Sequence, residues 1–140
     1  MAKIVIYTDG GSRGNPGPSA IGVIIGNKQY SEHIGAGTNN EAEYKAVIFA
    51  LKKARALYGK AKIKEQEVEL KSDSELLIRQ LNGEYKILEP RIQQLFIEVW
   101  NLKIDFGKVK FTLIPREKNK QADRLANEAL DQESRKATLF

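Results

Sequence analysis

Hydrophobic and polar positions follow two kinds of pattern along the chain, and these predict strands and helices. Five short runs are rich in β-branched and aromatic residues, which is typical of strands. These runs span residues 3–8, 20–26, 29–36, 68–71 and 108–114. Four longer segments carry apolar residues about every 3.6 positions, which predicts helices with one buried face. These segments span residues 40–58, 74–81, 90–104 and 121–133.

The resulting order of elements, βββαβααβα, predicts an α/β fold with one five-stranded mixed sheet flanked by helices. The first three strands are joined by short connections, so we expect a three-strand antiparallel meander with a hairpin at Asn27 and Lys28. Helical crossovers precede the last two strands, which places them parallel to the first strand. We expect one domain over residues 1–134 and a C-terminal tail without periodicity over residues 135–140.

Turn-forming residues mark the boundaries of these elements. Residues 10–18 are so rich in glycine, proline, serine and asparagine that we expect neither a helix nor a strand to pass through them. Gly59 favours the end of the first long helix, and Pro90 favours the start of a later one.

Composition narrows the chemistry that this fold can carry. The 140 residues include no cysteine and one histidine, which excludes a disulfide framework, a thiolate zinc site, a cysteine nucleophile and a histidine-rich metal centre. No apolar run approaches the roughly 20 residues of a membrane span, and the first residues lack a secretion signal, so we expect a cytoplasmic protein without membrane attachment. The net charge of +5 is compatible with a polyanionic partner, but the charge alone does not identify one, and a sequence motif is needed to support the inference.

Four acidic residues fall outside the carboxyl ends of the parallel strands, where an open α/β sheet has its crevice. Asp9 ends the first strand and Asp73 the fourth. Neighbouring strands lie about 4.8 Å apart, so adjacency of these two would bring their carboxylates together. Glu43 and Asp123 are expected in the first turns of two helices, from which both can point over the same edge.

Each acid also has an ordinary explanation. Glu43 could complete a capping box opened by Asn40, and Asp73 could be an acid favoured by the helix dipole. Asp123 could be a solvated charge beside an apolar stripe, whereas Asp9 at the end of a buried strand is costly without a partner. Together, however, the four form a hard oxygen-ligand site of the kind that Mg²⁺ prefers, and two ions about 3.5–4 Å apart suit in-line displacement at phosphorus.

Four segments in this order resemble the signature segments of type 1 ribonuclease H, in the form without the basic protrusion. They are TDGGSRGNPGP at 8–18, TNNEAEY at 38–44, KSDSELL at 71–77 and NKQADRLANEAL at 119–130. The resemblance implies a ribonuclease H-like fold and an endonuclease that hydrolyses the RNA strand of RNA–DNA hybrids with two Mg²⁺ ions, or Mn²⁺, leaving 5′-phosphate and 3′-hydroxyl ends. The catalytic and metal-binding residues that it implies are Asp9, Glu43, Asp73 and Asp123.

The resemblance also implies which residues contact nucleic acid. Selectivity for a hybrid requires reading 2′-hydroxyl groups across a shallow minor groove, for which short polar side chains and backbone groups are suited. The implied contacts are Gly10, Gly11, Ser12, Asn15, Asn39, Asn40 and Lys86, with Thr38 at a DNA phosphate. Turn formation and helix capping are the ordinary explanations for the serine and the asparagines.

Two departures from the family pattern bear on mechanism. Many members have a histidine in the loop before the last helix, whereas residues 115–120 contain none, and Arg116 is our candidate substitute among the catalytic residues. An arginine can contact phosphate but cannot shuttle protons near neutral pH. Residues 83–90 also leave no room for the extra helix and basic loop that some members insert. Binding should then rely on scattered groups such as Tyr85 and Lys86, with a smaller salt dependence.

Some features and alternatives stay open at this point. His33 lies within a predicted strand and is expected to be structural, and the role of Glu75, where the family more often has an amide, is undecided. We expect an RNA–DNA hybrid as partner, duplex RNA as a second candidate, and a monomer with no obligatory protein partner. The alternatives are a catalytically weak nucleic-acid-binding module of the same fold, a resolvase or integrase core, and an actin-like ATPase. The presence of all four acids argues against the binding module.

Overall fold

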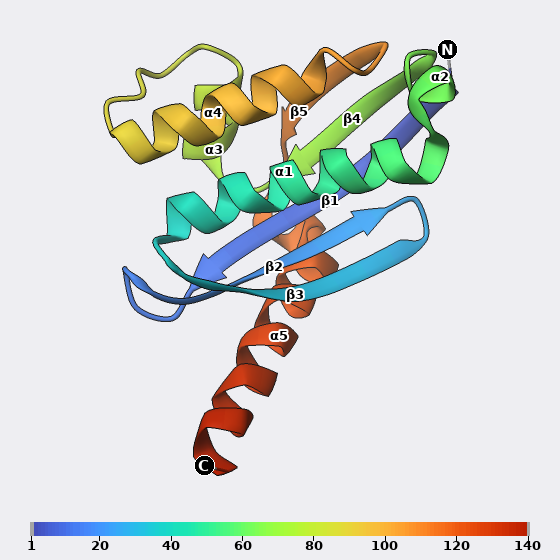
Figure 1. The fold of residues 1–140 in the computed structure, drawn as a ribbon. Coiled ribbons are helices and arrows are strands. Elements are labelled where there is room, and N and C mark those ends of the chain that lie inside the picture. Colours follow the sequence, from blue (N-terminus) through green and yellow to red (C-terminus); the bar gives the residue numbers. More distant parts are fainter. Residues whose placement is uncertain (1, 140) are drawn as a thin grey trace.

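The computed structural model describes the backbone of residues 2–139 and the side chains of residues 3–136, which form one five-stranded sheet with helices on both sides (Figure 1). The strands are β1 (Ala2–Ser12), β2 (Gly17–Ile25), β3 (Lys28–Gly37), β4 (Gln66–Ser72) and β5 (Lys108–Leu113). The helices are α1 (Asn39–Tyr58), α2 (Lys60–Ile63), α3 (Glu75–Leu81), α4 (Pro90–Lys103) and α5 (Lys120–Leu139), with a 3-10 turn η1 (Arg116–Lys118) before α5.

The topology confirms the predicted meander followed by parallel strands. The strand order is β3-β2-β1-β4-β5, with β1 antiparallel to β2, β2 antiparallel to β3, and β4 parallel to both β1 and β5. The last pair that β1 and β4 share is Tyr7 with Lys71. Asp9 and Asp73 each lie two residues beyond this pair, so the register brings both acids to one edge of the sheet.

Two apolar layers hold the helices on the sheet. α1 packs on β1 and β2 and contacts α4, whereas α5 packs on β1, β2 and β3. Ile6 and Tyr7 are consecutive in β1 and therefore point to opposite faces. Ile6 belongs to the larger core beneath α1, and Tyr7 packs against the smaller cluster that Ala122 and Leu125 of α5 form with Ile24. The alternation along β1 thus supplies both cores.

Two glycines allow α1 and α5 to approach the central strands closely. A Cβ atom on Gly10 would overlap the carbonyl oxygen of Ala42 in α1, and one on Gly22 would overlap that of Ala122 in α5. Ala42 directly precedes Glu43, and Ala122 directly precedes Asp123. The same close packing that joins each helix to the sheet therefore carries an acid to the edge where Asp9 lies.

The segment between the first two strands is more regular than its composition indicates. Our expectation that no strand passes through residues 10–18 is wrong at both ends, because β1 continues to Ser12 and β2 begins at Gly17. Gly10 and Gly11 continue the ladder by pairing with Ile21 and Ala20. Only residues 13–16 form the turn between the two strands. The other glycines and prolines of the segment lie in β1 or β2, where the neighbouring strand supplies hydrogen-bond partners for the backbone.

The last helix is longer than predicted. α5 runs through Leu139, so the residues beyond 134 that we expected to form a tail are helical as far as the structure describes them. No glycine or proline interrupts residues 121–139, and the helix continues past the edge of the sheet (Figure 1). The short helix α2 was also not predicted. Within residues 2–139, no helix combines the length and the hydropathy that a bilayer crossing requires.

Candidate active site

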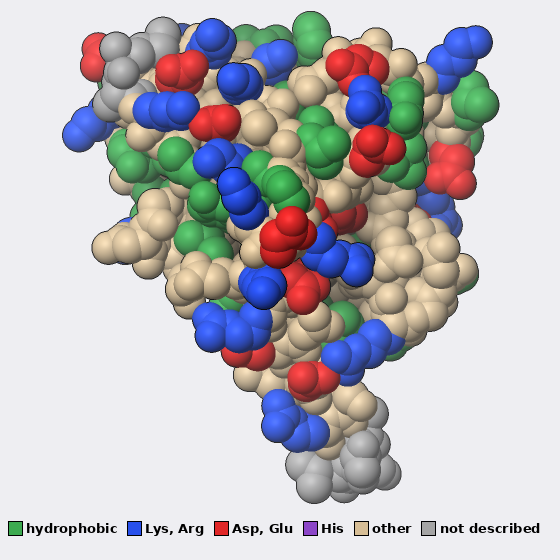
Figure 2. Space-filling model, turned by 180° about the vertical axis from the view of Figure 1, so that it is seen from behind, with side chains coloured by type: hydrophobic (Ala, Val, Ile, Leu, Met, Phe, Trp, Pro, Cys, Tyr) green, Lys and Arg blue, Asp and Glu red, His purple; other side chains and the backbone are tan. Residues whose placement is uncertain are grey.

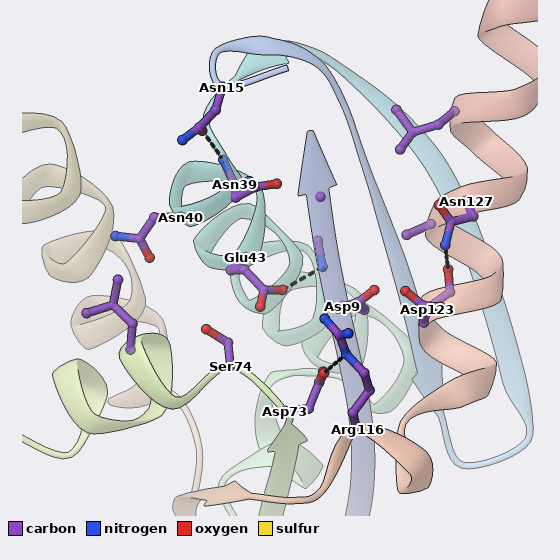
Figure 3. Close-up of a pocket in the computed structure, with 15 residues that line it drawn as sticks. Asp9, Asn15, Asn39, Asn40, Glu43, Asp73, Ser74, Arg116, Asp123 and Asn127 are labelled. Carbon is purple, nitrogen blue, oxygen red and sulfur yellow. Dashed lines mark hydrogen bonds and ion pairs between the residues drawn. The ribbon is translucent and has the colours of Figure 1, made fainter. Parts of the chain in front are cut away.

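Four acidic side chains line one open cavity of about 590 Å³ at the carboxyl ends of β1 and β4 (Figure 3). Asp9 comes from β1, Glu43 from α1, Asp73 from the residue after β4, and Asp123 from the first turn of α5. The prediction that these four residues meet at one edge of the sheet agrees with this arrangement. Four separate elements therefore supply one cluster of carboxylates.

Glu43 is held by the backbone of β1. Its Oε1 accepts a hydrogen bond from the Gly10 N–H at 2.6 Å, and the residue is 9% exposed. The capping box of α1 is formed by Thr38 and Glu41, not by Asn40 and Glu43, and Glu43 lies in the second turn. The ordinary explanation for Glu43 as a capping residue is therefore wrong, and its carboxylate faces the cavity instead.

Asp73 lies between β4 and α3 and is not in the first turn of a helix. Ser74 is the N-cap of α3 and accepts a hydrogen bond from the Leu77 N–H at 3.3 Å. The Asp73 Oδ1 accepts from the Asn119 side-chain amide at 2.8 Å, and its Oδ2 lies 3.7 Å from the Arg116 Nε. The carboxylate of Asp73 is thus bound on one side by a neutral donor and approached on the other by a cation.

The cluster is short of positive charge. The pKa of Asp9 is raised to about 9, most of all by burial, then by the nearby charges of Glu43, Asp73 and Asp123 and by a hydrogen bond to Asp123. Burial also raises the pKa of Glu43 to about 8, against the opposing effect of the Gly10 hydrogen bond. Crowded carboxyl groups of this kind are stabilised by a bound cation or by a proton.

The residues fit a divalent cation of the Mg²⁺ type. All four acids offer hard oxygen ligands, and burial together with the neighbouring acids makes the charged forms of Asp9 and Glu43 unfavourable without a cation. Among the residues that the structure describes, no three acidic or histidine side chains close around a single ion. Mg²⁺ commonly uses one or two carboxylates and takes its other ligands from water and substrate phosphates. An open carboxylate site therefore suits an ion shared with a phosphodiester.

Most of the implied nucleic-acid contacts lie around the same cavity. Its wall includes Gly10, Gly11, Asn15, Asn39, Asn40 and Arg116. A second cavity of about 380 Å³ is lined by Thr38 and Lys86, and it shares Asn15 and Asn40 with the first. The two cavities thus form one groove, with the acids at one end and Lys86 at the other. Ser12 lines neither cavity.

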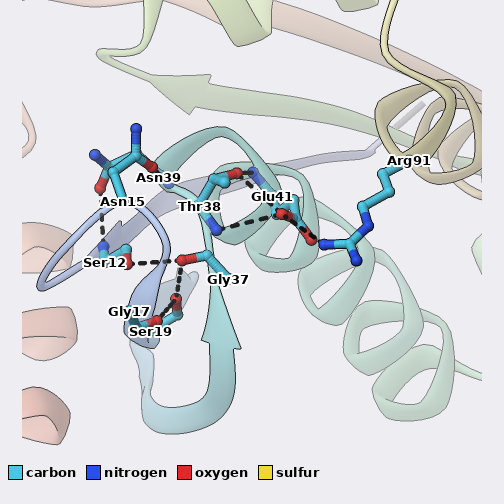
Figure 4. A network of polar contacts seen from close by, with 9 residues as sticks. All are labelled: Ser12, Asn15, Gly17, Ser19, Gly37, Thr38, Asn39, Glu41 and Arg91. Carbon is cyan, nitrogen blue, oxygen red and sulfur yellow. Dashed lines mark hydrogen bonds and ion pairs between the residues drawn. The ribbon is translucent and has the colours of Figure 1, made fainter.

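A network of polar contacts shapes the wall of this groove (Figure 4). The Ser12 N–H donates to the Asn39 Oδ1 at 2.9 Å, and the Asn39 N–H donates to the Asn15 Oδ1 at 3.0 Å. The Ser12 hydroxyl donates to the Gly37 carbonyl at 2.8 Å. Thr38 caps α1 through the Glu41 N–H at 3.2 Å. These contacts join the turn after β1 to the start of α1, so the polar residues also have the structural roles first considered for them.

The remaining predicted residues lie away from the acids. His33 Nδ1 is 4.0 Å from the Glu133 Oε2 on the α5 side of the sheet, which fits a structural role. Glu75 faces Arg79 at 3.5 Å, one turn further along α3, and does not line the groove. Tyr85 lies beneath the guanidinium of Arg79, whose carbon is 5.7 Å from the ring centroid.

Two asparagines of the site were missed from the sequence. Asn119 contacts Asp73 directly, and Asn127 lines the cavity while its amide donates to the Asp123 carbonyl at 3.0 Å. Asn119 stands at the start of the NKQADRLANEAL segment, where an asparagine before a helix is normally explained as a cap. Asn127 is one helical turn from Asp123, and this spacing could have predicted that Asn127 lies on the same face of α5 as the acid.

The sequence is similar to those of known proteins over most of its length. The model of a family described as reverse transcriptase-like matches residues 7–129. A ribonuclease HI from Halobacterium salinarum is 38% identical over 135 residues, which cover 92% of this chain and 65% of that protein. A bifunctional protein from Mycobacterium tuberculosis is 36% identical over 136 residues, which cover 92% of this chain and 36% of that protein. The chain thus spans only part of both relatives.

Solved structures share the fold over nearly the whole chain. LC11-RNase H1, isolated from compost by a metagenomic approach, has a TM-score of 0.87 and 46% sequence identity, covering 95% of this chain and 99% of that one. A second structure of LC11-RNase H1 is a complex with an RNA/DNA hybrid. RNase H1 from Halobacterium salinarum has a TM-score of 0.85 and 36% identity, covering 94% and 99%. With this fold, these relatives and the matching family model, the chain belongs to the type 1 ribonuclease H family.

Proposed function

We propose that this protein is a metal-dependent endoribonuclease that hydrolyses the RNA strand of RNA–DNA hybrids. The observation that carries the proposal is the meeting of Asp9, Glu43, Asp73 and Asp123 in one open cavity. Further support comes from LC11-RNase H1, which is similar to nearly the whole chain and whose structure has been solved with an RNA/DNA hybrid. No observation favours the alternative of a binding module without catalysis.

In this proposal the four carboxylates hold two divalent ions, with Mg²⁺ preferred and Mn²⁺ as the alternative. When bound, the ions supply an activated water for in-line attack and stabilise the leaving 3′ oxygen, which yields 5′-phosphate and 3′-hydroxyl ends. The chain keeps the ligands in place, because Glu43 is fixed by the Gly10 N–H and Asp73 by the Asn119 amide. Asp9 and Glu43, the acids with raised pKa values, gain most from a cation.

Arg116 is proposed to contact phosphate at the mouth of the groove. Its side chain is 92% exposed and reaches towards Asp73 at 3.7 Å (Figure 3). An exposed ion pair of this length contributes little to stability, so the guanidinium is free to turn towards a substrate or a departing product. It does not replace a histidine as a proton carrier, because arginine side chains do not shuttle protons near neutral pH.

Hybrid recognition is proposed along the groove between the two cavities. Asn15, Asn39 and Asn40 stand beside the acids, where short polar groups can read 2′-hydroxyls. Thr38 and Lys86 line the second cavity, where a phosphate of the DNA strand would lie. The hydroxyl of Ser12 is bound to the Gly37 carbonyl, so its part is to support the loop. We further propose that a cytoplasmic monomer carries out the reaction and that duplex RNA is the second candidate substrate.

The first prediction concerns the acids themselves. Asp9→Asn and Asp73→Asn should each lower cleavage of a labelled RNA–DNA hybrid by at least about 100-fold, because each removes a charged ligand that the ions need. The assay follows cutting of each strand of the hybrid, of duplex RNA and of duplex DNA, with Mg²⁺, Mn²⁺ or EDTA.

Asp131→Asn is the matched control, since Asp131 is an acid of α5 that pairs with Arg13 outside the groove. This variant should cut the hybrid like the unmodified protein. Binding of the hybrid without cutting, in the presence of Mg²⁺ and Mn²⁺, would leave the binding module as the correct function. Full activity of Asp9→Asn or Asp73→Asn would remove that residue from the site.

A further inference from the structure

Asn119 is a buried amide that touches the acid cluster without being part of it. The residue is 2% exposed and lies between η1 and α5. Its side-chain nitrogen donates two hydrogen bonds, to the Thr8 carbonyl at 2.9 Å and to the Asp73 Oδ1 at 2.8 Å. Both N–H donors of the amide are therefore used, one on β1 and one on Asp73.

These contacts connect three of the four acids. Thr8 directly precedes Asp9 in β1, and Asp73 follows β4. The Asn119 backbone carbonyl accepts a hydrogen bond from the Asp123 N–H at 3.1 Å, at the start of α5. One residue thus joins the backbone beside Asp9, the carboxylate of Asp73 and the backbone of Asp123.

The amide also fixes the rotation of the Asp73 carboxylate. With Oδ1 bound to Asn119, Oδ2 is the oxygen left towards Arg116 and the groove. Arg116 is too exposed to set this orientation, because exposed ion pairs are weak and mobile. A buried hydrogen bond to a charged acceptor is stronger and better defined. A neutral donor also orients Asp73 without adding a positive charge that would compete with a cation.

We propose that Asn119 is a positioning residue, which orients Asp73 and sets its spacing from Asp9 so that the acids bind divalent cations. The inference rests on the proposed function for its consequence in catalysis. Residues that orient metal ligands typically change cation affinity or activity by about 10- to 100-fold when they are replaced.

The test compares Asn119→Ala and Asn119→Leu with the unmodified protein. Alanine removes the donor, and leucine removes it while keeping nearly the same volume, so a packing defect would affect the two variants differently. Mg²⁺ binding without substrate is measured by calorimetry, and kcat and KM are measured on the hybrid at saturating Mg²⁺. We expect Mg²⁺ affinity and kcat to fall by about 10- to 100-fold in both variants, with KM changed by less than about threefold.

Asn82→Ala is the matched control. The Asn82 side-chain amide donates to the Phe111 carbonyl at 3.2 Å, away from the acids, so this variant loses the same kind of hydrogen bond. It should keep its Mg²⁺ affinity and kcat. Circular dichroism and thermal melting establish which variants are folded, and the leucine variant replaces the alanine variant if the latter does not fold.

Unchanged Mg²⁺ affinity in a folded Asn119 variant would overturn the inference. So would a fall in affinity of equal size in Asn82→Ala. Failure of the unmodified protein to cut the hybrid would count against the proposed function only, because the Mg²⁺ titrations compare the same proteins without substrate.

Discussion

Glu43 and Gly10 are 33 positions apart in the sequence, yet their hydrogen bond is one of the shortest in the site at 2.6 Å. Glycine is required at position 10 because α1 lies too close for a side chain. The same absence of a side chain leaves the Gly10 N–H accessible to the carboxylate. The lack of a side chain at Gly10 therefore explains both the close packing of α1 on β1 and the position of the Glu43 carboxylate.

The raised pKa values of Asp9 and Glu43 predict how stability depends on pH when no cation is bound. A carboxyl group whose pKa is higher in the folded state favours folding while it is protonated and opposes folding once it is ionised. The contribution of these two groups to stability should thus be greatest below about pH 4, decrease as the pH rises above the ordinary carboxyl pKa, and become level beyond about 8 for Glu43 and about 9 for Asp9. Thermal melting in EDTA across this range measures the effect.

Asp9→Asn should flatten this dependence, because an amide cannot ionise and no longer repels its neighbours. At pH 8 in EDTA the variant should melt higher than the unmodified protein, by about 4 °C for each kcal/mol that burying Asp9 beside the other acids costs. Saturating Mg²⁺ should stabilise the unmodified protein more than the variant. A variant that melts lower than the unmodified protein at pH 8 in EDTA would contradict the crowding of charges.

Residues of the site were predictable where chain order alone determines their place. Asp9 lies near the carboxyl end of β1 and Asp73 directly follows β4, and the rule that parallel strands end at one edge was sufficient to bring them together. Asn119 was not predictable in this way, because its bond to the Thr8 carbonyl spans 111 positions. An amide has no charge pattern or periodicity that indicates such a partner.

At the scale of elements, Gly22 links the packing of α5 to the position of Asp123. Gly22→Ala should lower the free energy of unfolding by about 1–3 kcal/mol, because the added methyl group overlaps the α5 backbone at Ala122. Movement of α5 away from β2 would also displace Asp123, so cleavage should fall although Gly22 lies outside the groove. Chemical denaturation and the hybrid assay measure the two effects.

Gly11→Ala is the control for stability. Gly11 is also a strand glycine, but a Cβ atom there would have no neighbour within 4 Å. Its unfolding free energy should change by less than about 0.5 kcal/mol, as for surface substitutions in general. Equal unfolding free energies of the Gly22→Ala and Gly11→Ala variants would contradict the prediction, because α5 would then have moved to accept the methyl group without loss of stability.

The long helices could be predicted because each buries one face and therefore has a clear period, and the strands because they are rich in β-branched and aromatic residues. Their ends were harder to predict. β1 and β2 extend further because each supplies hydrogen-bond partners to the other across glycine positions. α5 extends further because a helix without glycine or proline continues after its apolar face has ended. Boundaries of this kind depend on partners that are distant in the sequence.

At the scale of the whole molecule, the distribution of positive charge bears on how nucleic acid would bind. Lysine and arginine side chains lie scattered among acidic ones on the face that Figure 2 shows, although the net charge is +5. Residues 82–89 lead directly from α3 to α4 and carry no additional helix. Hybrid binding should therefore involve few phosphate contacts.

This distribution predicts a modest salt dependence. We expect log K for hybrid binding in Ca²⁺ to fall with log salt at a slope of about −3, which corresponds to three or four phosphate contacts. Lys86→Ala should make this slope less negative by about 1, because Lys86 lines the groove. Lys60→Ala should not change it, since α2 lies at the opposite end of the sheet (Figure 1). A slope as steep as that of relatives with a basic protrusion would contradict the prediction.

The central place of β1 has one more consequence. This strand is hydrogen-bonded to β2 on one side and to β4 on the other, and α1 and α5 cover its faces. Its amides reach solvent only when both neighbours and both helices separate, so local fluctuations leave Asp9 in place. The loop before α4 and η1 are instead mostly exposed. A bent or twisted duplex would therefore meet acids on a strand that is held on every side, between segments that solvent surrounds.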